Sequence, residues 1–444
     1  MIDPDIRPLP GAERMPPDRV LARFRELLAG TSWADQTPDT LFAPVYTRAE
    51  SAGRFAGAVC ELYLAHLAVL RCLLAGGPFS RAGERYAELA EPVRRFYLDW
   101  PVFTDDLAPA DLTAPDRLAR LFGRPDVVLA ADGPKAVETN FDTAAAGQER
   151  PDDMWQLAAS IFGPAPEYLK TGRPLQGMSD YFVEHAGGRP TEYHWIMKDD
   201  PVARREMAPL VDYLNRSQQL VRHTLHYPGD DVSRLQPADG QHYLHRSVSI
   251  FTVNKDRQRF AELLAGLRPI APSSTVPIGL STLASKLFLA WLSDPDARPA
   301  GLTERQLAAV EALVPWTRVL TMLDRTALAP VLAEPAEYVL KKADSYQATE
   351  VHLGWTVPAG QWPELIERCR TEPQPWIIQR RVRPKLYRLA EFTDDGLVFR
   401  DTGLACCPYL MGGRFRGLET WITPPEPDLT MITRMQFVPH FIRG

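Results

Sequence analysis

One segment, residues 124–142, constrains the fold of this chain more than any other. Two short apolar runs flank the sequence Ala-Asp-Gly-Pro at residues 131–134. An Asp-Gly pair between two strand-like runs is a strong signal for a β-hairpin. Because a hairpin places the start of its first strand beside the end of its second, we expect Asp126 to lie close to Glu138 and Asn140.

The polar residues of this segment form a candidate site for a hard cation. Side chains alternate along a strand, so Glu138, Asn140 and Asp142 are expected on one face. Carboxylate and amide oxygens suit Mg²⁺, which fills the rest of its shell with phosphate and water. The alternative is an ordinary hairpin whose polar face is solvated. Asp142 is either a further ligand or a brace for the following loop.

Composition narrows the class of protein. A length of 444 residues predicts two or three lobes, and 45% hydrophobic with 24% charged residues is ordinary for a globular chain. The net charge of −6 argues against a nucleic-acid partner. We find no continuous apolar run of about 18 residues and no signal-peptide pattern. Five cysteines without CxxC spacing predict a reduced, cytoplasmic protein. Together with the charge and the lack of a long apolar run, we expect no nucleic-acid and no membrane partner.

Periodicity and capping signals predict a mixed α+β chain whose first hundred residues form a mainly helical layer. The expected helices cover residues 17–29, 47–75, 81–97, 202–225, 256–266, 282–293, 303–313 and 362–370. The expected strands cover residues 248–253, 339–341 and 376–382, with a second hairpin at 392–399. We divide the chain into an N-terminal helical layer (1–115), a metal-binding and substrate part (116–300), and a nucleotide-binding and C-terminal part (301–444).

A second set of residues late in the chain is typical of phosphate handling. Lys341 ends a hydrophobic strand, from which its ammonium could reach an α- or β-phosphate. The strand at residues 375–382 is apolar and then turns polar, which suits an adenine slot. Either segment alone is weak evidence, since a lysine at a strand end is usually solvated.

Taken together, these stretches resemble the ATP-grasp superfamily, in particular its circularly permuted branch related to glutathionylspermidine synthase. The metal motif precedes the lysine, as in that branch, and the resemblance spans roughly residues 115–425. It implies a circularly permuted ATP-grasp fold with an N-terminal helical layer. The matching motifs are Arg124-x-Asp126 with Glu138-x-Asn140-x-Asp142, Leu283-Ala284-Ser285-Lys286, Pro315-Trp316-Thr317-Arg318, Tyr338-Val339-Leu340-Lys341 and Trp376-Ile377-Ile378-Gln379.

The resemblance implies an ADP-forming, ATP-dependent carboxylate–amine ligase. Such an enzyme makes an amide bond between small amino-acid or peptide substrates through an acyl-phosphate. It implies Mg²⁺ ligands at Asp126, Glu138 and Asn140, and catalytic roles for Arg124 and Arg414. The implied nucleotide-binding residues are Lys341, Lys286, Tyr346, Gln379, Arg380, Arg381 and Val382. A homodimer is compatible with this class, and Arg414 has the alternative of being an exposed hairpin arginine.

One loop departs from the family pattern. Relatives carry a glycine-rich loop after the lysine, whereas residues 346–351 read Tyr-Gln-Ala-Thr-Glu-Val. Glycines let backbone N–H groups approach phosphates closely, so their loss would reshape this loop. The alternatives are therefore a degenerate ATP-grasp protein that binds nucleotide or a partner without turnover, and a phosphotransferase that stops at the phosphorylated acid.

Two other patterns favour structural roles. The pairs His223/His226 and His242/His245 have an i, i+3 spacing that could fit a metal on a helix. No further ligand accompanies them at motif spacing, which favours surface positions. Cys406 and Cys407 are expected to be buried thiols, because no base can be assigned to them.

Overall fold

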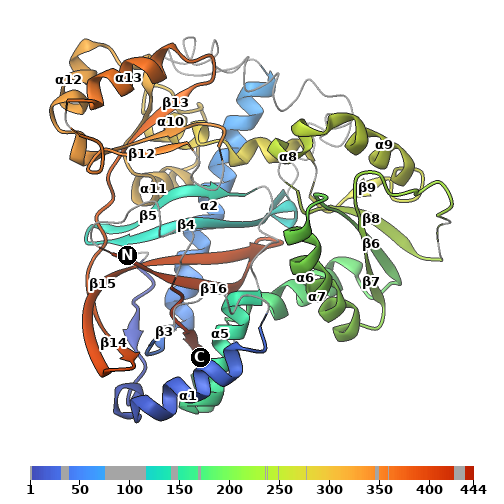
Figure 1. Ribbon diagram of the computed structural model, residues 1–444. Coiled ribbons are helices and arrows are strands. Elements are labelled where there is room, and N and C mark those ends of the chain that lie inside the picture. Colours follow the sequence, from blue (N-terminus) through green and yellow to red (C-terminus); the bar gives the residue numbers. More distant parts are fainter. Residues whose placement is uncertain are drawn as a thin grey trace.

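The protein is described here by a computed structural model. It describes residues 3–31, 40–75, 117–141, 149–168, 172–235, 237, 239–248, 250–276, 278–345, 350–358, 360–424 and 436–444. Within them the strands form four sheets, with helices between and around them (Figure 1). The expected helix at 81–97, Asp142 and Tyr346 lie outside the described residues.

The predicted hairpin is confirmed, and it forms one edge of the largest sheet. The strand order of that sheet is β2-β14-β15-β4-β5, with β16 paired to the second half of β15, and all these pairs are antiparallel. The strands are β2 (Leu41–Phe42), β14 (Tyr387–Thr393), β15 (Gly396–Met411), β4 (Phe122–Ala130), β5 (Gly133–Asn140) and β16 (Arg414–Thr423).

A second antiparallel sheet lies above the hairpin in Figure 1, with two helices over its outer face. Its strands, in order, are β10 (Thr317–Val319), β13 (Trp376–Arg380), β11 (Tyr338–Lys342) and β12 (Val351–Leu353). Leu340 and Ile378 pack with α12 (Arg325–Ala333) and α13 (Trp362–Thr371) in a separate small core. Since side chains alternate along a strand, Lys341, Ile377 and Gln379 face the other way, toward the hairpin.

The third sheet is parallel and has the order β7-β6-β8-β9. Phe182 on α6 packs against Tyr193, Trp195 and His245 on one of its faces. Its elements are α6 (Pro174–Ala186), β6 (Thr191–Ile196), α7 (Pro201–Ser217), β7 (Val221–His226), β8 (Gln241–Arg246), α8 (Ile250–Lys255), α9 (Arg257–Leu267) and β9 (Ser273–Ser274).

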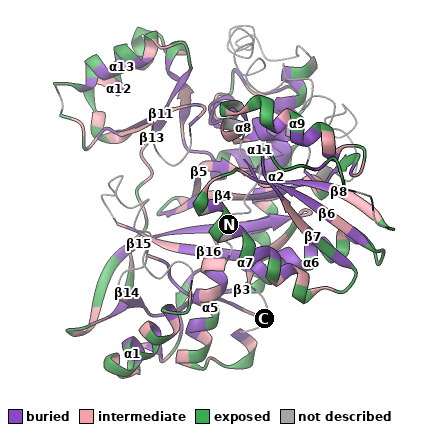
Figure 2. Ribbon diagram, turned by 45° about the vertical axis from the view of Figure 1, so that its right-hand side comes forward, coloured by how far each residue is buried: buried purple, intermediate pink, exposed green. Residues whose placement is uncertain are grey.

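The long helix α2 (Ala49–Ala75) connects these parts. It packs on α10 (Leu287–Ser293), α11 (Glu304–Leu313), β15 and β16, and its residues belong to the main hydrophobic core. Among the described residues it is the one helix long and apolar enough to cross a membrane, yet 61% of its most apolar window is buried inside the protein. In Figure 2, buried residues gather on the central strands, and exposed ones on the outer faces of α12 and α13.

The fourth sheet joins the two ends of the chain. Its order is β1-β3-β17, from β1 (Arg7–Pro8), β3 (Val45–Arg48) and β17 (His440–Arg443). The helices α1 (Pro17–Leu28) and α5 (Glu149–Phe162) lie beside it at the bottom of Figure 1. Among the described residues before 76, short strands therefore accompany the helices expected at 17–29 and 47–75.

Two local predictions are wrong. The expected helix over residues 202–225 ends at Ser217, and residues from Val221 onward form the parallel strand β7, whose pairing with β6 overrides the helical pattern. The β-branched stretch at residues 248–253 is expected as a strand, but its greater part belongs to α8, because tertiary packing outweighs a weak local propensity. The other expected helices and strands within the described residues are present, with shifted ends.

The helix α11, which packs on α2, begins with the capping box expected from Thr303 and Gln306. The Thr303 hydroxyl accepts the Gln306 backbone N–H at 3.2 Å, and the Gln306 side chain accepts the Thr303 N–H at 2.9 Å. We expect Thr303→Ala to cost about 1 kcal/mol and to speed hydrogen exchange of the Gln306 amide. Thr371→Ala, which removes an exposed hydroxyl at the end of α13, should change neither; equal effects would contradict the cap.

Candidate functional site

The hairpin places the two candidate acidic ligands directly opposite each other. Asp126 on β4 pairs with Glu138 on β5, and Arg124 pairs with Asn140. The register shifts between Asp126 and Val127, so Val137 is an extra, unpaired residue of β5. This β-bulge turns the Val137 carbonyl to a partner outside the hairpin: it accepts a hydrogen bond from Lys341 Nζ at 2.9 Å.

Lys341 is anchored by the sheet to which it belongs. Its ammonium also donates to Gln379 Oε1 at 2.8 Å, and Gln379 Nε2 donates to Thr317 Oγ1 at 3.2 Å. Gln379 is 1% exposed. Its amide therefore orients Lys341, and its expected place in an adenine slot stays a prediction.

A second buried lysine reaches the same carboxylate from the start of α10. Lys286 Nζ lies 3.1 Å from Glu138 Oε1 and donates to the Ser345 carbonyl at 2.6 Å. The Lys286 side chain is only 3% exposed. Three segments far apart in the sequence, at β5, α10 and β11, thus meet at Glu138.

Arg124 is held on the other side of Asp126. Its guanidinium donates to Asp126 Oδ1 at 3.2 Å and to Glu419 on β16, and it lies over the rings of Tyr409 and Trp421. The Tyr409 hydroxyl donates to the same Glu419 carboxylate at 2.9 Å. Sequence analysis missed Glu419 and Tyr409; the only signal was a carboxylate within an apolar strand-like run at residues 417–422.

Charge interactions set the protonation of this cluster. Burial raises the pKa of Asp126 to about 6, and the two neighbouring carboxylates add to the rise. Burial also acts to raise the pKa of Glu138, but Lys286 and Lys341 outweigh it and the pKa is lowered. Burial lowers the pKa of Lys341 to about 8, and the nearby Lys286 adds to this. Of these two carboxyl groups, Asp126 is therefore the one whose ionised form is destabilised in the folded protein.

The donor set fits a hard divalent cation. Asp126 and Glu138 are opposite each other, with side chains 23% and 31% exposed, so a ligand can reach their oxygens. Their mutual repulsion helps raise the pKa of Asp126, and a bound cation would relieve it. Asn140 lies on the same face of β5, two residues from Glu138, and could supply an amide oxygen.

Other predicted residues lie outside this cluster. Arg414 is exposed and pairs with Glu184 on α6 at 3.1 Å, which matches the alternative of a hairpin arginine rather than a position in the cluster. The N–H groups of Arg380 and Arg381 already donate to the carbonyls of Trp316 and Glu337. The nucleotide-binding role of Val382 stays a prediction.

Of the two patterns expected to have structural roles, the cysteine pair follows the prediction and the histidine pairs do not. Cys406 and Cys407 are buried free thiols, as expected, and burial raises the pKa of Cys406 to about 12. The expected surface position of the histidine pairs is wrong for His223, His226 and His245, which are buried. Their spacing is also not helical, since they lie on the parallel strands β7 and β8.

Comparison with known proteins identifies the fold but no family. A glutathione synthetase-like effector from Globodera pallida, in its apo form, matches 98% of this chain and 100% of its own length, with a TM-score of 0.52 and 12% identity. A putative γ-glutamylcysteine synthetase from Methylobacillus flagellatus matches 84% of this chain and 86% of its own, with a TM-score of 0.35 and 8% identity, which is too weak to carry an argument. No family profile and no curated protein matches.

The chain therefore has the overall fold of a glutathione synthetase-like protein, and its mixed helices and sheets agree with the expected α+β class. At 12% identity this likeness establishes the fold alone. The activity has to be argued from the residues of the cluster.

The raised pKa of Asp126 predicts a pH-dependent stability. A carboxyl with a folded pKa of about 6, above its ordinary value of 3.8, binds its proton more tightly in the folded state. Its ionisation between about pH 4 and pH 6 therefore destabilises the fold. Over that range we expect the wild type to lose stability relative to Asp126→Asn, measured by denaturant unfolding at constant ionic strength. Asp132→Asn, at the exposed hairpin tip, should follow the wild type; parallel curves for all three proteins would refute the assignment.

Proposed function

We propose that this protein is an ATP-dependent carboxylate–amine ligase of the circularly permuted ATP-grasp type, which forms an amide bond between small amino-acid-like substrates and releases ADP. The observation that carries the proposal is the convergence of Lys286 and Lys341 on the Asp126–Glu138 pair. Buried ammonium groups beside reachable carboxylates suit a bound metal-phosphate, where both kinds of charge find partners.

Each residue has a role in this proposal. Asp126, Glu138 and Asn140 would hold Mg²⁺, which supplies charge neutralisation for the phosphates when it is bound. Lys286 and Lys341 would donate hydrogen bonds to phosphate oxygens. These lysines come from different elements, so a phosphate held between them is fixed in position, and positioning provides much of the catalysis in phosphoryl transfer.

Arg124 would stabilise negative charge that develops on a phosphorylated carboxylate. Glu419 and Tyr409 support this role, because they fix the guanidinium before a substrate arrives. A donor that needs no reorganisation during the reaction is worth more than a mobile one. We propose no catalytic role for Arg414, given its exposed pair with Glu184.

We also propose a division of the chain into three parts, a helical layer (1–115), a metal-binding and substrate part (116–300) and a nucleotide-binding and C-terminal part (301–444). The enzyme would act in the cytoplasm on small amino acids or peptides, as a monomer or a homodimer.

A degenerate ATP-grasp protein that binds nucleotide or a partner without turnover is the second candidate. The N–H groups of Arg380 and Arg381, where a base would bond, donate to carbonyls of the protein itself, which weighs against a complete ligase site. The structural neighbour from Globodera pallida is described as a glutathione synthetase-like effector. Under this alternative, Mg-ATP or a partner would bind and no ADP would form.

The test is ADP release from Mg-ATP in the presence of pairs drawn from a panel of amino acids and short peptides, with mass spectrometry of the product. A ligase should release ADP only when both an acid and an amine are present. Glu138→Gln should lower this rate by about 100-fold or more, while Asp132→Asn on the same hairpin should leave it unchanged. Binding of Mg-ATP without ADP release under every pair would support the second candidate and refute the ligase.

Two adjacent lysines of β11 offer a matched comparison. Lys341 faces the cluster, whereas Lys342 faces the opposite way and pairs with Glu372 at 3.3 Å. Lys341→Met should weaken Mg-ATP binding at least about tenfold, the loss expected for a charge-assisted hydrogen bond. Lys342→Met should leave the affinity close to that of the wild type in calorimetric titration. Equal losses would mean that the phosphates do not bind at Lys341.

A further inference from the structure

A second group of polar side chains lies on the parallel sheet, on a face of β6 that the proposed ligase site does not use. Glu192 and His194 are two residues apart on β6 and therefore point to the same side. His242 on β8 pairs in register with Glu192, and His226 on β7 pairs with Ile196. Four polar groups from three neighbouring strands thus share one face.

The distances between these groups are short. His194 Nε2 lies 3.1 Å from His242 Nδ1, and His242 Nδ1 lies 3.9 Å from Glu192 Oε2. One ligand atom from each of these three residues falls within 4.8 Å of the others. The two imidazole rings are stacked, with centroids 5.4 Å apart and 21° between their planes.

We propose that Glu192, His194 and His242 form a binding site for a first-row transition metal of the Zn²⁺ class, with a fourth position left for water or a ligand. Zn²⁺ binds imidazole nitrogen at about 2.0–2.1 Å, which separates two ligands of a tetrahedral site by about 3.3 Å. The separation of the two histidine nitrogens, 3.1 Å, is close to this value, and the Glu192 oxygen, 3.9 Å from His242, has to move closer by a side-chain shift. Imidazole ligands select such metals over Mg²⁺. This site is therefore expected to bind a different metal from the hairpin site, whose ligands are all oxygens.

Neighbouring residues fix the orientation of the ligands. When His194 Nε2 binds the metal, its Nδ1–H can donate to His226 Nε2, which lies 3.0 Å away. The Thr224 hydroxyl donates to Glu192 Oε1 at 2.7 Å, which leaves Oε2 for the metal. Partners of this kind, behind the ligands, are typical of protein zinc sites.

Burial and access are both compatible with a metal. His194 is 3% exposed, and its two ring nitrogens lie within hydrogen-bonding distance of His226 and His242. Glu192 keeps 17% of its side chain exposed, and Arg222 next to it is 75% exposed and can move aside. A dication can therefore reach the ligands from the Glu192 side.

The test is a zinc titration of the full chain after treatment with a chelator, in competition with a chromogenic chelator. We expect one tightly bound Zn²⁺ per chain, and with Co²⁺ the visible absorption of a four-coordinate site. His242→Ala and Glu192→Gln should each weaken binding by about 100-fold or more, and His226→Gln by about 10- to 100-fold, the range known for residues behind a ligand.

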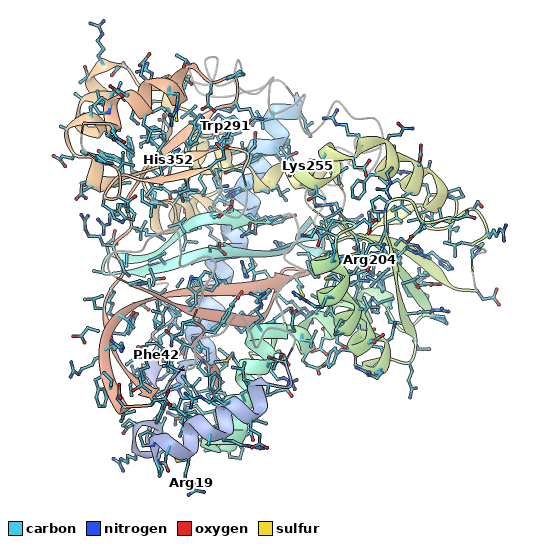
Figure 3. The ribbon with its side chains drawn as sticks, viewed as in Figure 1. Arg19, Phe42, Arg204, Lys255, Trp291 and His352 are labelled. Atoms are coloured by element: carbon cyan, nitrogen blue, oxygen red, sulfur yellow. The ribbon has the colours of Figure 1, made fainter. Side chains whose placement is uncertain are left out.

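A histidine elsewhere provides the matched control. His352, labelled in Figure 3, lies on β12 in the second antiparallel sheet, stacked on Trp376. His352→Ala should bind zinc like the wild type, and circular dichroism would verify that each variant is folded. Absence of stoichiometric zinc in the wild type would overturn the proposal and leave the histidines as a hydrogen-bonded chain. Equal binding by wild type, His242→Ala and Glu192→Gln would overturn it as well. The wild-type Co²⁺ spectrum decides the matter even if a variant fails to fold.

Discussion

The organisation of this molecule depends on two carboxylates that face each other across a hairpin. Asp126 and Glu138 repel, and burial adds to the cost of their charges. Three cations offset this cost: Lys286, Lys341, and Arg124 on the same strand as Asp126. The two lysines come from distant parts of the chain, so the start of α10 and the strand β11 meet the hairpin where the repulsion is strongest.

The extra residue in β5 explains how this junction is built. A regular hairpin would place Val137 opposite Asp126. The bulge leaves Val137 without a partner on β4, and its carbonyl accepts a hydrogen bond from the Lys341 ammonium. Gln379 and Thr317 continue the same chain of hydrogen bonds into the second sheet. A local irregularity therefore becomes the contact between two sheets, and a ligand bound there would touch both.

Local sequence signals predicted much of this arrangement. The Asp-Gly turn was enough to place Asp126 close to Glu138 and Asn140, and Lys341 could be assigned to the end of a strand. The exact pairing could not be predicted, because the register next to the turn would continue with Asp126 opposite Val137, and the bulge moves Asp126 opposite Glu138. Glu419 could not be found in this way, because it lies 295 positions from Arg124 and comes close to it only through the pairing of β4 with β15 and of β15 with β16. The histidines were misassigned for a related reason. A spacing of three residues suggested a helix, whereas the parallel register of β6, β7 and β8 brings them together instead.

The sheet that joins the ends of the chain has a consequence for biosynthesis. Strand β3 lies between β1 and β17, and its parallel partner β17 begins at His440. A ribosome releases the chain from the N-terminus onward, so one edge of β3 waits without its partner while almost four hundred residues are made. An open strand edge is a template for association with other chains. Until residues 440–443 emerge, this edge of β3 therefore stays open to association with other chains.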